Sequence, residues 1–178
     1  MNKALIIIDM WDQYIPGNKR FDGLLEQLGL KLQEFMQQSD MPVVVSSYPN
    51  INHDFNDTSN LKGTSNMIQH GLFCHAGDSI VSWDKEEVLT FLKLHNVTDL
   101  YFAGVSFPGC VQGRQLGIDA MKDDFNCFIV ADFVLDLLSL NYTEYDIINS
   151  TYTAILTSDY QYTCSKQIEK VREKGRVR

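Results

Sequence analysis

The stretch from Leu100 to Met121, LYFAGVSFPGCVQGRQLGIDAM, constrains the fold of this chain more than any other. Four apolar residues open it, as is typical of a buried strand, and a turn of small residues from Gly104 to Gly109 follows. The chain then enters a predicted helix whose first residue is Cys110. Free N–H groups and the positive end of a helix dipole favour thiolate over thiol, which would lower the cysteine pKa. Cys110 is therefore either a nucleophile or a small packing residue.

A second apolar run, from Ala4 to Ile8, ends at a carboxylate. Its continuous β-branched character predicts a central parallel strand that is buried on both faces. Asp9 follows directly, and the carboxyl ends of parallel strands form the ligand crevice of open α/β sheets. Asp9 is therefore a candidate site residue, although acids at such places also serve as helix caps or turn residues.

The rest of the chain alternates between strand and helix patterns. Strands are expected at 4–8, 42–46, 100–103 and 127–131, and helices at 21–38, from Asp84, from Cys110, at 143–154 and from 158 or 159 onward. Asp132 is expected just past its strand. The polar segment 48–71 shows no periodicity and predicts a long loop, and 72–83 predicts a crossover. The alternation predicts one domain over residues 1–178, a three-layer α/β/α sandwich with a mostly parallel, doubly wound sheet.

Composition limits the partners of the protein. The net charge is −8 and the pI is near 4.8, which argues against nucleic-acid binding because that needs a basic surface. The four cysteines form no CxxC pair, and no apolar run reaches membrane length. We expect a cytoplasmic protein that acts on a small molecule and binds neither nucleic acid nor membrane.

The polar loop contains two residue types that can bind a metal. His53 and Asp54 are residue types that ligate zinc or iron, but no set of His, Asp and Cys surrounds them at ligand spacing. A structural or solvated role is favoured for His53, and neither a metal ion nor another cofactor is expected.

Two separated motifs resemble those of the isochorismatase-like cysteine hydrolases. The segment ALIIIDMWDQY at 4–14 is similar to the first strand and acid of that family. The segment GVSFPGCVQGRQLGIDAM at 104–121 is similar to its second signature, in which a Gly, a turn and a Cys-Val pair lead into a helix. IVSWD at 80–84 is similar to a segment of one subgroup. The resemblance extends over nearly the whole chain and implies the family's doubly wound α/β fold.

The resemblance also implies a function. It implies a hydrolase acting on a small amide or related C–N bond, with Asp9 as base and Cys110 as the nucleophile that forms a covalent intermediate. A cis peptide is implied at Val105–Ser106, with an oxyanion hole made by the backbone N–H groups of Ser106 and Cys110. Relatives are commonly homo-oligomers, so a homo-oligomer is expected here too.

The family's triad also contains a lysine, which has no counterpart in this chain. The corresponding place upstream of Cys110 holds His75, Ala76 and Gly77, and the nearest lysine, Lys85, falls in the first turn of the next predicted helix. Without a cation the thiolate is less favoured and Asp9 takes up a proton more easily. A catalytically degenerate member that binds a ligand or has a structural role is the alternative hypothesis. A redox-sensing thiol is a third.

Four side chains are candidates for the substrate pocket. Trp11, Trp83 and Phe107 are candidate walls, although aromatic residues in such places more often belong to the core. His75 is a candidate replacement for the missing cation, although a histidine held by hydrogen bonds is the commoner situation.

Overall fold

The computed structural model describes residues 2–10, 19–46, 66–136 and 143–168. Six strands form one sheet in the order β3-β2-β1-β4-β5-β6, and every pair of neighbours is parallel. The strands are β1 (Lys3–Ile8), β2 (Val43–Ser46), β3 (Ser79–Val81), β4 (Asp99–Val105), β5 (Asn126–Leu135) and β6 (Gln161–Thr163). The helices are α1 (Lys19–Gln38), α2 (Asn66–Cys74), α3 (Lys85–Leu94), α4 (Gly109–Gly113), α5 (Ile118–Met121) and α6 (Glu144–Thr157). The predicted α/β fold with a parallel sheet is confirmed.

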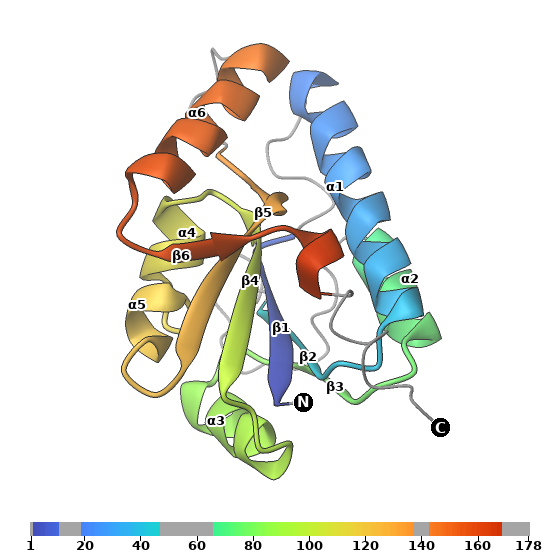
Figure 1. Ribbon diagram of the computed structural model, residues 1–178. Helices are drawn as coiled ribbons and strands as arrows, with labels where there is room; N and C mark the ends of the chain where they lie inside the picture. The colour runs from blue at the N-terminus through green and yellow to red at the C-terminus, as the bar shows by residue number, and fades with distance from the viewer. Residues whose placement is uncertain (1, 11–18, 47–65, 137–142, 169–178) are drawn as a thin grey trace, which may run out of the picture.

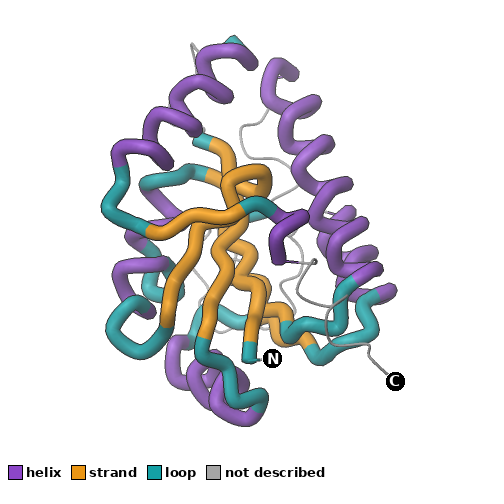
Figure 2. Tube along the Cα trace, viewed as in Figure 1, coloured by secondary structure: helices purple, strands orange, loops and turns teal. Residues whose placement is uncertain are grey.

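The sheet is doubly wound around β1. The chain starts in the centre of the sheet, runs outward through β2 and β3, and then returns to the other side of β1 as β4. Helices cover both faces, with α1 and α2 on one side and α3, α4 and α5 on the other (Figures 1 and 2). The strand order reverses between β1 and β4, and such a switch point opens a crevice at the carboxyl ends of the strands.

The core consists of two layers separated by the sheet. Side chains of β1 alternate between them because successive residues of a strand point to opposite faces. Leu5 and Ile7 pack against α1, and Ile6 and Ile8 pack with side chains of α3 and α4. All four are completely buried, and each contributes about 2 kcal/mol by leaving water. The continuous apolar run therefore corresponds to a strand buried on both faces, as predicted.

Three local predictions were wrong. Residues 66–74 form helix α2 instead of the end of a loop and the start of a crossover, because packing against α1 stabilises a short segment whose periodicity is weak. Strand β6 replaces the start of the predicted final helix, and α6 extends past the predicted end at 154 to Thr157. Strand β5 runs on to Leu135, so Asp132 lies inside it and accepts hydrogen bonds from Ser165.

The cap prediction at α3 is confirmed, since the Asp84 side chain accepts the backbone N–H of Glu87. No helix in the described ranges is long and apolar enough to cross a membrane.

The contact between β1 and β4 requires a glycine. Gly104 pairs with Ile8, has φ of +127°, and a Cβ there would overlap the backbone carbonyl of Ile8. Neither strand can move away, because both lie in the middle of the sheet with partners on each side.

We therefore expect Gly104→Ala to lower the free energy of unfolding by at least about 2 kcal/mol, from backbone strain and overlap together. Urea unfolding followed by circular dichroism measures this change. Gly113→Ala is the matched control, because a Cβ at Gly113 meets no atom within 4 Å. Equal effects of the two substitutions would contradict this account of the strand contact.

Candidate active site

Two neighbouring strands end in residues with an unusual backbone. Asp9 directly follows β1 and Ser106 directly follows β4, and their φ angles are +54° and +59°. Non-glycine residues rarely adopt this left-handed conformation, and such strain gathers at functional sites. The Asp9 side chain is completely buried. The predicted location of Asp9, at the carboxyl end of the first strand, is confirmed.

Cys110 lies just after the turn that follows β4. It is the second residue of α4, it is half-buried, and its backbone N–H donates to the Ser106 carbonyl at 2.6 Å. The cis peptide implied at Val105–Ser106 is wrong. The turn instead has a cis bond at Phe107–Pro108, where the tertiary amide of proline weakens the preference for trans.

The pKa of the Cys110 thiol is raised above its ordinary value. Burial is the largest cause, followed by the negative charge of the Asp9 carboxylate. The positive charge of Arg114 and a hydrogen bond with the Ser106 side chain act in the opposite direction but do not prevail. The prediction that a helix dipole lowers the Cys110 pKa was wrong. Helix α4 has only five residues, so its dipole is correspondingly small.

Arg114 is the site residue that the sequence reading missed. Its Nε and Nη2 atoms each lie 3.0 Å from Oδ2 of Asp9, and its own side chain is 31% exposed. The available signal was its spacing, since a residue four positions after Cys110 on a helix lies on the same face. The resemblance to the family points to a cation before Cys110, whereas Arg114 follows it.

The helix predicted from Cys110 onward is interrupted where Arg114 lies. Helix α4 ends at Gly113, Arg114 adopts an extended conformation with ψ of 161°, and α5 begins four residues later. Within the interruption, the Gln115 side chain donates to the backbone carbonyl of Trp83. This contact ties the turn that carries Arg114 to the segment following β3.

One oxygen of Asp9 remains without a partner. Oδ2 accepts both bonds from Arg114, whereas Oδ1 is buried and has no hydrogen-bond partner. This buried oxygen is therefore a hydrogen-bond acceptor that no donor uses, in a carboxylate close to the Cys110 thiol. The arrangement can accept a proton from Cys110, and the sulfur can then attack an electrophilic carbon.

Comparison with protein families gives one match that extends over most of the chain. A model described as the isochorismatase domain matches residues 3–159 of the 178. The chain belongs to the isochorismatase family. The resemblance expected from the two motifs is confirmed. Comparison with curated proteins gives no match.

Solved structures of similar fold include several with family names. A protein described as an isochorismatase from Burkholderia xenovorans has a TM-score of 0.65 at 14% identity, covering 98% of this chain and 88% of that one. An N-carbamoylsarcosine amidase from Thermoplasma acidophilum has 0.56 at 17%, covering 93% and 97%. A cysteine hydrolase from Pseudomonas syringae has 0.56 at 13%, covering 97% and 93%. Identities this low show a shared fold.

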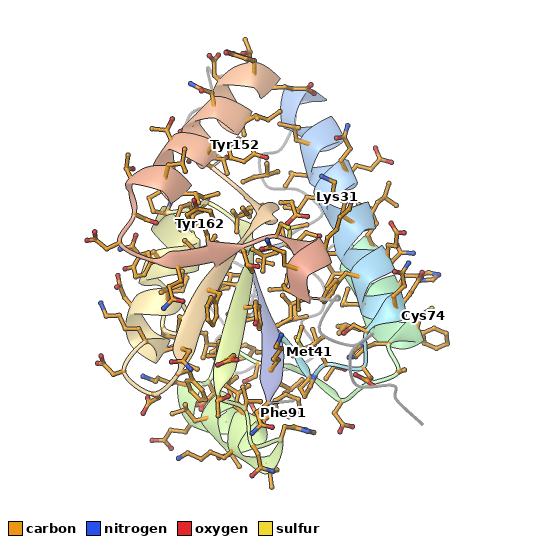
Figure 3. All side chains as sticks on the ribbon, in the orientation of Figure 1. Lys31, Met41, Cys74, Phe91, Tyr152 and Tyr162 are labelled. Carbon is orange, nitrogen blue, oxygen red and sulfur yellow. The ribbon has the colours of Figure 1, made fainter. Side chains whose placement is uncertain are left out.

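The structure places the other candidates of the isochorismatase-family site differently. His75 lies at the end of the sheet where the strands begin, and Asp9 lies where they finish. Its ring nitrogens face the backbone carbonyls of Met36 and Met41 at 2.8 and 3.0 Å. Met41 precedes β2, and Figure 3 shows it near the starting ends of the strands. His75 therefore holds the end of α1 to the segment before β2 and does not lie beside Asp9.

The aromatic candidates divide into three cases. Phe107 is completely buried in the core layer that contains α3 and α4, so it presents no surface to a ligand. Trp83 is half-buried and bonded through its carbonyl to the turn beside Arg114, which keeps it near the site. Trp11 lies outside the described residues, as do His53 and Asp54.

Two other features bear on the chemistry of the family. No group of three or more His, Cys, Asp or Glu side chains in the described ranges is arranged to hold a metal ion. The oxyanion hole at the backbone N–H groups of Ser106 and Cys110 stays a prediction. In the structure the Cys110 N–H donates to the Ser106 carbonyl. An oxyanion would therefore have to compete with that carbonyl.

The causes of the Cys110 pKa shift give a prediction with a definite sign. Asp9→Asn removes the negative charge and should lower the Cys110 pKa, so iodoacetamide should modify Cys110 at a lower pH than in the wild type. Alkylation followed by mass spectrometry of the Cys110 peptide across pH 6 to about 11 measures this.

Cys127 and Cys74 are internal controls in the same samples. Burial alone raises the Cys127 pKa to about 12, and Cys74 is exposed on α2 (Figure 3), so neither should respond to the change at Asp9. A Cys110 profile that is unchanged, or shifted to higher pH, would contradict the contact between the two side chains.

Proposed function

We propose that this protein is a cysteine hydrolase that cleaves a small amide or related C–N bond. Cys110 is the nucleophile and Asp9 is the base. The observation that carries the proposal is that the completely buried Asp9 carboxylate lies close enough to Cys110 for its negative charge to raise the pKa of the thiol. The two proteins of similar fold support the proposal, since one is named as an amidase and the other as a cysteine hydrolase.

The raised pKa of Cys110 determines how the reaction begins. The resting group is a thiol, so its proton leaves as the sulfur attacks, and Asp9 accepts that proton in the same step. A carbon–sulfur bond forms at the carbonyl carbon while the carbonyl π electrons move to oxygen. The resulting tetrahedral intermediate expels the amine, which receives a proton from Asp9, and an acyl–Cys110 thioester remains.

The second half of the reaction uses water. Asp9, again ionised, takes a proton from a water molecule as its oxygen attacks the thioester carbonyl. The carbon–sulfur bond then breaks, the carboxylic acid is released, and the thiolate of Cys110 recovers its proton from Asp9. The proposed donors to the oxyanion in both halves are the backbone N–H groups of Ser106 and Cys110, a contribution of about 3 kcal/mol in comparable sites.

The redox-sensing alternative is weakened by the same electrostatics. Oxidation of cysteine starts from the thiolate, and sensor cysteines are accessible groups with a low pKa. Cys110 is half-buried and its pKa is raised. This environment suits a thiol that is deprotonated only when a substrate is present.

We expect Cys110→Ala to abolish hydrolysis, and Asp9→Asn to reduce kcat/KM by about 10²- to 10⁴-fold, as for the loss of a positioned base. The assay is ammonia or amine release from a panel of small primary amides and N-carbamoyl compounds. Acid-quenched mass spectrometry of the wild type should show an acyl adduct on the Cys110 peptide.

Cys74→Ser is the matched control, because it removes an exposed thiol on α2 and should leave the rate unchanged. Hydrolysis that survives in Cys110→Ala, or the absence of both turnover and adduct across the panel, would count against the hydrolase. The second outcome would favour the degenerate member.

A further inference from the structure

We propose that Arg114 takes the place of the family's lysine, as a positioning residue that anchors Asp9 through Oδ2 and leaves Oδ1 as the proton acceptor. This inference rests on the proposed function. It removes the feature that favoured a degenerate enzyme, since a cation does contact the base, from a different segment of the chain.

The geometry of the ion pair is what positions Asp9. Nε and Nη2 both lie 3.0 Å from the same carboxylate oxygen, and the guanidinium is planar and rigid, so the carboxylate cannot turn without losing both bonds. Asp9 is completely buried, and a buried carboxylate needs a cation because burial otherwise destabilises its charge strongly. Arg114 supplies that charge from a partly exposed position.

The unpartnered Oδ1 gives the second part of the argument. Buried polar atoms nearly always have a hydrogen-bond partner, so an exception calls for an explanation. With Oδ2 occupied, Oδ1 is the oxygen that remains for the thiol proton and later for water. Arg114 thus selects which oxygen of Asp9 is the base.

Neither of the two cations that the sequence suggested for this role fills it. Lys85, the nearest lysine before Cys110, donates from Nζ to the Ala120 carbonyl at 2.6 Å. His75 lies at the end of the sheet where the strands begin, away from Asp9. Arg114 also acts directly on the nucleophile, because its charge lowers the Cys110 pKa against the larger effects of burial and Asp9.

An arginine differs from a lysine in one chemical respect. Its guanidinium does not give up a proton in proteins, so it cannot protonate the leaving amine. The proton taken from Cys110 must return through Asp9 alone. The pH profile of kcat/KM should therefore show no fall in activity that is caused by deprotonation of Arg114.

The test follows Cys110 alkylation by iodoacetamide with pH, as resolved by peptide mass spectrometry, in Arg114→Gln, Arg114→Lys and the wild type. Removing the positive charge should raise the Cys110 pKa, so Arg114→Gln should shift the profile to higher pH, giving about tenfold slower alkylation at pH 8. Arg114→Lys should restore most of the rate, because it restores the charge.

Lys122→Gln is the matched control. It removes a cation from an exposed ion pair with Asp119, at 2.9 Å, and should leave the Cys110 profile unchanged. The Cys74 peptide in every sample controls for reagent and pH. An Arg114→Gln profile equal to that of the wild type, or one reproduced by Lys122→Gln, would overturn the inference.

Hydrolysis supplies the second readout. Arg114→Gln should reduce kcat/KM by about 10²-fold through kcat, and the loss should be much smaller in an Asp9→Asn background, where only the direct effect of the Arg114 charge on Cys110 remains. The double variant Asp9→Asn/Arg114→Gln removes both charges of the buried ion pair. If Arg114→Gln alone fails to fold, the double variant can still be compared with Asp9→Asn. Equal losses in both backgrounds would contradict the positioning role.

The two proposals fail in different ways. Alkylation needs no substrate, so an unchanged Cys110 profile in Arg114→Gln overturns the role of Arg114 even if the enzyme hydrolyses amides. The absence of turnover and adduct in the wild type overturns the hydrolase even if the profile shifts.

Discussion

The parallel pairing of β1 with β4 is the constraint on which the site depends. The two strands pair from Lys3 with Asp99 through to Ile8 with Gly104, in the middle of the sheet. Because they run in the same direction and end together, the residue after β1 and the turn after β4 emerge side by side. The glycine allows the closest approach at the last pair, and the left-handed backbone at Asp9 and at Ser106 redirects both chains immediately beyond it.

Much of this fold could be predicted because its central strands are buried on both faces. Continuous apolar runs such as Ala4 to Ile8 are a strong local signal, and the segment 21–38 that follows this run has helical spacing of its apolar residues. The elements that were missed are short and depend on partners distant in sequence. Helix α2 has a single completely buried side chain, Ile68, and packs on α1, while β6 is a three-residue strand at the edge of the sheet. Local sequence does not contain those partners.

The site was predictable to the same degree and for a related reason. Asp9 and Cys110 each follow a recognisable strand, so the rule for parallel sheets places both at one edge. The pKa of Cys110 was not predictable, because it depends on burial and on the distance to Asp9 rather than on helix position alone. Arg114 was missed because its role depends on a contact with Asp9, which lies 105 residues earlier in the chain.

The position of Arg114 connects nucleophile and base in a way that an upstream lysine does not. A lysine from another segment can move independently of the cysteine, whereas Arg114 and Cys110 are four residues apart, and the Arg114 N–H donates to the Cys110 carbonyl at 3.1 Å. Any displacement of α4 therefore moves the sulfur and the anchor of Asp9 together. The distance between base and nucleophile is fixed by one short helix and by the strand pair beneath it. Charge at the right place, rather than lysine at the right sequence position, is what this arrangement of base and thiol requires.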